Sequence, residues 1–144
     1  MKCRFITLFI IAALLCTLSA GCSNAKKLTE SDVGYAGPIL DNILSGIKDR
    51  DYDKFSKDFS TTLKNAIPKS NFEALVDTLN SKIGDYSSRT FSGASKTRSN
   101  NMDMDVVVYN AKFSKESGNV LITMSFSNSK LVEGLYFNSA NLAK

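Results

Sequence analysis

Histidine is absent from this chain of 144 residues, and cysteine is confined to its first 22 residues. Without histidine the chain has neither a Ser-His-Asp triad nor a His-ligated zinc site. The cysteines are Cys3, Cys16 and Cys22, so the rest of the chain builds no disulfide framework and no thiolate metal site. Glycine-rich phosphate loops and calcium loops are missing as well. The sequence therefore predicts no metal, no cofactor and no catalytic set, and we expect a protein that is not an enzyme.

A strong excess of charge of one sign is also lacking. The net charge is +4, but Lys2 and Arg4 lie in a segment that we expect to be removed, and residues 1–21 contain no acidic side chain. The mature chain then has 16 basic and 14 acidic side chains, a net charge of +2. This excess is too small to indicate a nucleic-acid partner. The length is that of a single domain.

The one long apolar run lies at the N-terminus. Two basic residues precede residues 5–18, "FITLFIIAALLCTL", and the small residues Ser19, Ala20 and Gly21 follow. This three-part layout is typical of a secretory signal peptide. A run of 14 residues is short for a membrane span, which needs about 20 apolar residues. We therefore expect residues 1–21 to be an export signal.

The stretch "LSAGC", residues 18–22, resembles the lipobox of bacterial lipoproteins. The resemblance implies cleavage between Gly21 and Cys22 and a diacylglycerol on the sulfur of Cys22. The strongest lipoboxes have leucine three residues before the cysteine, whereas this chain has Ser19 there and Leu18 one residue earlier. The alternative is an ordinary signal peptide cut after Ala20. With lipidation, the protein would be exported and held by membrane lipid at the outer face of the cell membrane, or at the outer membrane of a two-membrane cell.

Residues 22–34 are polar and aperiodic after the cysteine, and we expect them to form a flexible tether. Residues 35–140 form the domain. Apolar residues at helical spacing predict helices over residues 39–48, 52–59 and 70–83, with Asp51 and the "SNFE" capping box at Ser70 as helix starts. Leu63 and Ile67 continue the apolar face of the second of these helices. Pro68 and Gly84 end helical segments.

After Gly84 the period changes to 2. Strands are expected over residues 85–93, 102–113, 120–126 and 131–137, with residues 95–101 as a loop. In the second strand the more apolar face changes side, which indicates a bulge near Tyr109 or burial on both faces. Helices followed by about four antiparallel strands predict an α+β domain.

The pieces "DYDKF", "KIGDY" and "GLYF" resemble a family of small prokaryotic extracytoplasmic domains of unknown function. The resemblance covers about residues 35–138. That family is placed with the cone-shaped folds of the nuclear transport factor two and ketosteroid isomerase type. The resemblance implies N-terminal helices packed on the concave side of a curved antiparallel sheet. No catalytic role is carried over, because no motif here matches the catalytic residues of the isomerases.

If the cone contained a pocket, its lining would come from a few side chains. Asp103 and Asp105 are two residues apart on a strand and share a face, so they could share a proton or bind a cation. We favour an exposed strand end instead, with the neighbouring methionines packed inward. Tyr52, Tyr109 and Met124 are the other candidates, although for the tyrosines we favour ordinary packing in the core or at its rim.

Three functions stay open. The first is a noncatalytic lipoprotein that binds a partner protein, a cell-wall component or a small molecule. The second is an enzyme that uses a carboxylate or a tyrosine in the pocket of the cone. The third is an assembly role in which the open face of the sheet forms a homodimer. A pocket filled by apolar side chains would argue against the second, and an exposed apolar sheet face would favour the third.

Overall fold

The computed structural model describes residues 25–99 and 101–144. A short strand β1 (Lys26–Leu28) and a turn of 3-10 helix, η1 (Ser31–Val33), precede four helices. The helices are α1 (Ala36–Asp49), α2 (Tyr52–Phe55), α3 (Thr61–Ala66) and α4 (Lys69–Lys82). Four strands follow: β2 (Tyr86–Ser99), β3 (Met102–Phe113), β4 (Val120–Phe126) and β5 (Val132–Asn138). The predicted α+β class is confirmed.

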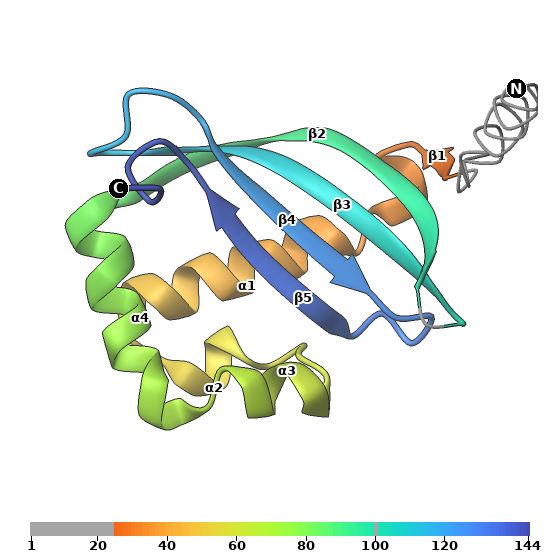
Figure 1. Cartoon of the computed structure of the whole chain (residues 1–144), viewed down its shortest axis with the longest axis horizontal. Helices are drawn as coiled ribbons and strands as arrows, with labels where there is room; N and C mark the ends of the chain where they lie inside the picture. Colours follow the sequence, from red (N-terminus) through yellow and green to blue (C-terminus); the bar gives the residue numbers. More distant parts are fainter. Residues whose placement is uncertain (1–24, 100) are drawn as a thin grey trace, which may run out of the picture.

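The strands form one open antiparallel sheet in the order β1-β2-β3-β4-β5. Neighbours in the sheet are neighbours in the chain, except that all four helices lie between β1 and β2. All helices cover the same face of this sheet, and the long strands β2 and β3 bend over α1 (Figure 1). Five strands are therefore present among the described residues, where about four were predicted.

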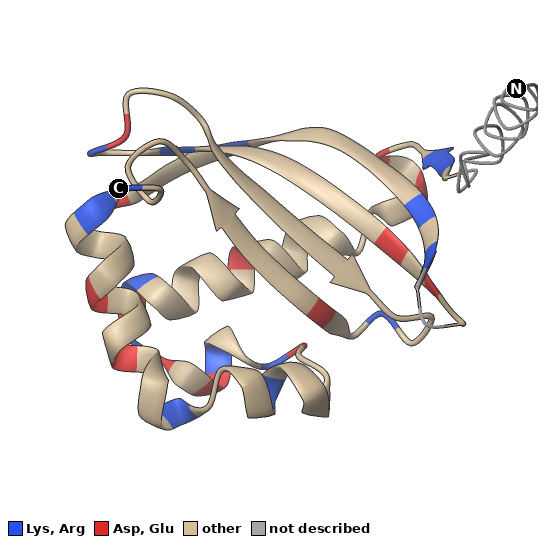
Figure 2. Cartoon of the chain, viewed as in Figure 1, with Lys and Arg blue, Asp and Glu red and all other residues tan. Residues whose placement is uncertain are grey.

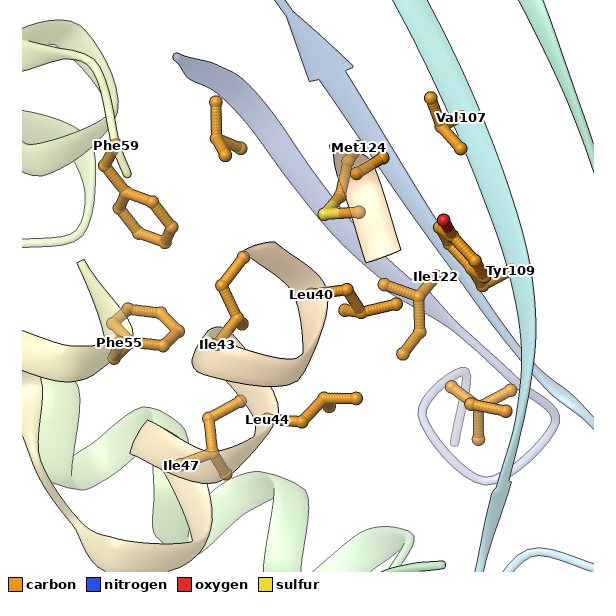
Figure 3. Packing of buried hydrophobic residues seen from close by; sticks show 14 of the residues in the cluster. Leu40, Ile43, Leu44, Ile47, Phe55, Phe59, Val107, Tyr109, Ile122 and Met124 are labelled. Atoms are coloured by element: carbon orange, nitrogen blue, oxygen red, sulfur yellow. The ribbon is translucent and has the colours of Figure 1, made fainter. Parts of the chain in front are cut away.

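The core lies between α1 and the covered face of the sheet. The apolar stripe of α1 points into it, as its helical spacing predicts, and meets alternate residues of β3 and β4. Figure 3 shows Leu40 and Leu44 facing Ile122 and Tyr109, while Ile43 and Ile47 lie on the side of Phe55 and Phe59. Since the side chains of a strand alternate, every second residue lies on the other face of the sheet, which no helix of residues 25–99 and 101–144 covers.

A glycine brings the first two helices together. An added Cβ at Gly46 would lie 2.5 Å from the backbone nitrogen of Phe55 and 2.7 Å from its Cα. Only a residue without a side chain lets α1 approach Phe55, the last residue of α2, this closely. The chain reverses between the two helices at Arg50, which has a φ of 55° and ends α1. Asp51 then caps α2 by accepting a hydrogen bond from the backbone nitrogen of Lys54, as predicted.

The irregularity predicted near Tyr109 lies on the partner strand. β3 itself is continuous, but β2 has register shifts between Tyr86 and Ser88 and between Phe91 and Gly93. The second of these extra residues lies beside the pair of Phe91 with Tyr109. Each extra residue increases the local twist of the strand, which fits the bend of β2 over α1 (Figure 1).

Three local predictions are wrong. Residues 26–33 do not belong to a flexible tether, because β1 pairs with β2 and because Leu28 and Val33 are buried. Residues 95–99 extend β2 instead of forming a loop, since β3 pairs with all of them and β1 pairs with Ser95 and Lys96 from the other side. Helix α4 begins after Pro68, which is its N-cap, so Ser70 does not start a capping box. The predicted signal segment 1–21 and Cys22 lie outside the described residues.

Candidate functional site

Two of the predicted pocket residues lie in the core. Tyr109 and Met124 are 1% and 0% exposed, and Figure 3 shows both between the sheet and α1. The ring of Tyr109 packs edge-on against Phe91, 5.9 Å between centroids, and the guanidinium of Arg89 lies 4.9 Å from the ring centre. Burial, the largest effect, raises the pKa of the Tyr109 hydroxyl. Neither residue lines any of the cavities described below.

Tyr52 lines a cavity but has a packing role. Its hydroxyl donates a 2.9 Å hydrogen bond to the backbone oxygen of Ile67, and its ring packs edge-on against Phe72. The cavity beside it is about 330 Å³ and opens at the corner between α1 and α4. Arg50 borders this cavity and pairs at 2.6 Å with both Glu73 and Asp77. Arg50 is therefore already paired, whereas Asp53 and Lys69, which also line this cavity, form no ion pair among the described residues.

The two aspartates on β3 differ, and the predicted exposed strand end is wrong for one of them. Asp103 is half exposed and lies 3.8 Å from Arg98. Asp105 is 5% exposed, whereas Met102, which we expected to pack inward, is 48% exposed. Asp105 is buried because the side chains of β3 alternate, which places it on the same face as the buried side chains of Val107 and Tyr109.

Asp105 is held by three side chains from distant parts of the chain, and we call these four residues the Asp105 cluster. The Tyr35 hydroxyl donates to Oδ2 at 2.8 Å, and Lys130 Nζ donates to the same oxygen at 3.0 Å. Lys96 Nζ forms an ion pair with Oδ1 at 2.9 Å, although this enclosed oxygen accepts no well-aligned hydrogen bond. Lys130 Nζ also lies 4.5 Å from the centre of the Tyr35 ring. Figure 2 shows these basic positions, on β2 and in the β4–β5 turn, around the acidic positions of β3.

The electrostatics of the cluster favour a charged carboxylate. Burial is the largest effect on Asp105 and by itself raises the pKa, but Lys96, Lys130 and the Tyr35 hydroxyl together outweigh it and lower the pKa to about 2. Burial, and then the hydrogen bond to Asp105, raise the pKa of Tyr35. A carboxylate with so low a pKa is a poor general base near neutral pH. The cluster therefore ties the start of α1 to β2, β3 and the β4–β5 turn.

A second arrangement lies at the opposite end of the sheet, where α1 and α4 end and β2 begins. We call it the distal groove. Its main cavity is about 310 Å³, and a second one of about 300 Å³ continues along α1 and shares Leu44, Lys48 and Tyr86 with it. The floor of the main cavity is formed by Leu44, Ile47, Leu79 and Phe113, and the polar residues on its rim are Lys48, Asn80, Asp85 and Tyr86.

Local structure holds the rim in place. Arg89 donates two hydrogen bonds of 2.7 Å to the carboxylate of Asp41, which fixes β2 against the middle of α1. Gly84 ends the α4 segment with a φ of 79°, a left-handed conformation that glycine adopts without strain. The Asp85 backbone nitrogen donates a 2.9 Å hydrogen bond to the Ser114 hydroxyl, which holds the start of β2 in place. Burial, and then the negative charge of Asp41, raise the pKa of the Tyr86 hydroxyl.

Residues 25–99 and 101–144 contain no group of three or more histidine, cysteine, aspartate or glutamate side chains that could hold a metal ion. Within the same residues, no helix is long and apolar enough to cross a membrane.

Comparison with known proteins places most of the domain in one family. A family described as "Protein of unknown function (DUF3887)" matches residues 41–135, about two thirds of the chain. This span runs from the middle of α1 to the middle of β5 and includes the floor of the distal groove and Asp105. No curated protein and no solved structure matches the chain.

Proposed function

The chain belongs to the DUF3887 family of proteins of unknown function, and we propose that it is a lipid-anchored extracytoplasmic lipoprotein whose domain is a noncatalytic binding module. Membership of this family does not assign an activity to the chain. The observation that carries this proposal is the sequence "LSAGC" at residues 18–22, placed directly before a folded domain. In this proposal residues 1–21 are an export signal, and Cys22 carries the acyl chains. Two or three chains suffice for stable anchoring, where one would be marginal.

The structure adds a geometric constraint to such an anchor. Strand β1 begins at Lys26, four residues after Cys22, and four extended residues span at most about 14 Å. Leu28 and Val33 are buried, so this segment is part of the domain. A lipid on Cys22 would therefore hold the β1 end of the domain close to the bilayer. Figure 1 places β1 at one end of the long axis and the α4–β2 junction, with the distal groove, at the other.

The interior supports binding in preference to catalysis. The candidates Tyr109 and Met124 are packed in the core, and Asp105 already has three partners. An enzyme built on these groups would need a cavity that reaches them, and the cavities described above do not. We also propose that the fold is of the nuclear transport factor two type. Its support is the arrangement of all helices on one face of a bent antiparallel sheet.

The uncovered face of the sheet favours a second candidate function, assembly through a homodimer or a protein partner. Leu121 on β4 and Tyr136 on β5 are 39% and 67% exposed, and β3 contributes the half-buried Val106 and Val108 to the same face. Exposed apolar side chains that cluster on one surface are a common feature of interfaces. Equilibrium sedimentation of the wild type and of a Tyr136→Lys variant tests this function: a dimer that the substitution dissociates supports it, and a monomeric wild type contradicts it.

Intact mass measurement of the protein purified from native membranes tests the anchor. We expect a chain that begins at residue 22 with added acyl mass, and recovery in the membrane fraction. A Cys22→Ser variant should lose both properties. A Cys16→Ser variant is the matched control, since this cysteine lies within the predicted signal and should leave both properties unchanged. A soluble wild-type chain without acyl mass would refute the anchor.

A further inference from the structure

We propose that the distal groove binds a small zwitterion with an apolar body, the chemical class of a free apolar amino acid. This inference rests on the proposed noncatalytic binding role and adds a site and a ligand class to it. The groove is distinct from the Asp105 cluster and from the core positions that the sequence predicts for a pocket.

The floor of the groove suits an apolar body. Leu44, Ile47, Leu79 and Phe113 are all buried, yet each contributes to the wall of the cavity. They come from α1, α4 and β3, so the floor is formed only when the helices and the sheet are packed together. A cavity of about 310 Å³ lies at the small end of the range for ligand sites. A branched or aromatic side chain fits such a space, whereas a large cofactor does not.

The rim of the groove suits two opposite charges. Lys48, near the end of α1, supplies an ammonium group, and Asp85, just before β2, supplies a carboxylate. In the part of the chain that the structure describes, neither side chain forms an ion pair or a side-chain hydrogen bond. Some other charged groups on the helices are paired, for example Asp49 with Lys54, and others, such as Asp53 and Lys69, are not. Two unpaired charges of opposite sign therefore border one apolar cavity.

Neutral polar groups complete the rim. The Asn80 backbone oxygen accepts a 2.9 Å hydrogen bond from Lys115, while its side-chain amide has no partner among the described residues. The Tyr86 hydroxyl is likewise without a hydrogen-bond partner there, although its ring is held 5.7 Å from that of Phe113. An amide and a hydroxyl can each donate or accept. They can therefore bind either end of a zwitterion.

Charge balance selects the ligand class. A carboxylate alone could pair with Lys48 but would place a second negative charge near Asp85, and an amine alone would meet the reverse problem at Lys48. A molecule with both groups satisfies both residues, and charge-assisted hydrogen bonds are the stronger kind. Since the groove lies at the end of the molecule far from β1, a ligand from the aqueous phase reaches it when the other end is held at a membrane (Figure 1).

The test is isothermal titration of the purified full-length mature protein, in detergent micelles if it is acylated, with four small molecules. Leucine is the probe. 4-Methylpentanoate lacks its amine, 3-methylbutylamine lacks its carboxylate, and glycine lacks its apolar body. We expect leucine to bind and each of the other three to bind at least about tenfold more weakly, which corresponds to the loss of one good contact.

Variants assign the contacts. Lys48→Gln should weaken the binding of leucine and 4-methylpentanoate and strengthen that of 3-methylbutylamine, because it removes a charge of the same sign as the amine. Asp85→Asn should weaken the binding of leucine and 3-methylbutylamine and strengthen that of 4-methylpentanoate. Lys64→Gln and Asp53→Asn are the matched controls, because both side chains are exposed and outside the groove. Both should bind leucine as the wild type does. A circular dichroism spectrum of each variant confirms that it is folded.

The inference is overturned if the wild type does not bind leucine, if the two analogues bind as tightly as leucine, or if the control variants lose as much affinity as the groove variants. These results are independent of the anchor. Acylated, membrane-bound protein that does not bind leucine refutes the ligand class alone. Protein that binds leucine but carries no acyl group refutes the anchor alone. Chemical conversion of leucine during the titration would refute the noncatalytic role.

Discussion

Replacement of Asp105 by asparagine is the sharpest test of the physical account of this domain. The substitution keeps the shape of the side chain and one oxygen that can accept from the Tyr35 hydroxyl, but it removes the negative charge that faces Lys96 and Lys130. Both lysine side chains are nearly half exposed, 42% and 45%. They can therefore turn toward water after the substitution, and the lost charge interaction is the main effect that we expect.

The pKa of Asp105 gives the magnitude. It falls from an ordinary value of 3.8 to about 2 in the folded protein. At about 1.4 kcal/mol for each pH unit, the folded structure favours the charged carboxylate by about 2 kcal/mol. We therefore expect Asp105→Asn to lower the free energy of unfolding by about 2 kcal/mol at pH 7. This loss is smaller than the cost of breaking a fully buried ion pair, about 3–5 kcal/mol, because the lysines remain hydrated.

The sign of the pH dependence follows from the lowered pKa. A carboxyl group whose pKa is lower in the folded state stabilises the protein above its unfolded pKa, and the stabilisation disappears as the pH falls through the folded value. For Asp105 this window extends from about pH 4 down to about pH 2. The difference between wild type and variant should therefore fall to about half at pH 3 and to less than about 0.5 kcal/mol at pH 2.

Urea unfolding followed by circular dichroism at pH 7, 3 and 2 measures this difference. Other carboxylates titrate in both proteins, so only the difference between the two curves is interpreted. Asp103→Asn is the matched control, since it removes an exposed carboxylate from the same face of the same strand. We expect its effect to stay within about 0.5 kcal/mol at each pH. A loss for Asp105→Asn that is the same at pH 7 and pH 2 would refute the assignment of the stabilisation to the charge.

Two further substitutions test the packing. Gly46→Ala would place a methyl group 2.5 Å from a backbone nitrogen of α2, so we expect it to destabilise the fold by about 1–3 kcal/mol or more. Gly93→Ala meets nothing within 4 Å and should change the stability by less than about 0.5 kcal/mol; equal effects in urea unfolding would contradict the close approach of α1 and α2. Met124→Ala removes a side chain that is 0% exposed and should cost about 2–5 kcal/mol. Met102→Ala, at a position 48% exposed, should cost less than about 0.5 kcal/mol, and a small loss for Met124→Ala would indicate space around it.

Periodicity predicted those parts of the fold in which local pattern and burial agree. The stripe of α1 and the alternation of β4 are examples, because each has apolar residues at the spacing of its element and faces the core. β1 was missed because three residues that include Lys26 and Lys27 have no strand signal of their own. The strand forms because β2 offers it an edge, which is a property of the sheet and not of the segment.

The Asp105 cluster could be predicted only in part. The phase of β3 places Asp105 on the face of Val107 and Tyr109, so the alternation contains the signal that this carboxylate is inside. Its partners are a different matter. Tyr35 is 70 residues away and Lys130 is 25 residues away, and no local pattern connects them. The distal groove could not be predicted from a local pattern either, since its rim residues meet only at the junction of α1, α4 and β2.

The ordered segment before α1 changes what an anchor at Cys22 would mean. A flexible tether over residues 22–34 would span up to about 45 Å and let the domain turn freely above a membrane. With β1 paired to β2, only residues 23–25 lie between Cys22 and the sheet. The orientation of the domain then depends on three pairs of residues, together with the burial of Leu28 and Val33. If the anchor is present, the β1–β2 pairing therefore determines both the distance of the distal groove from the bilayer and the direction in which it opens.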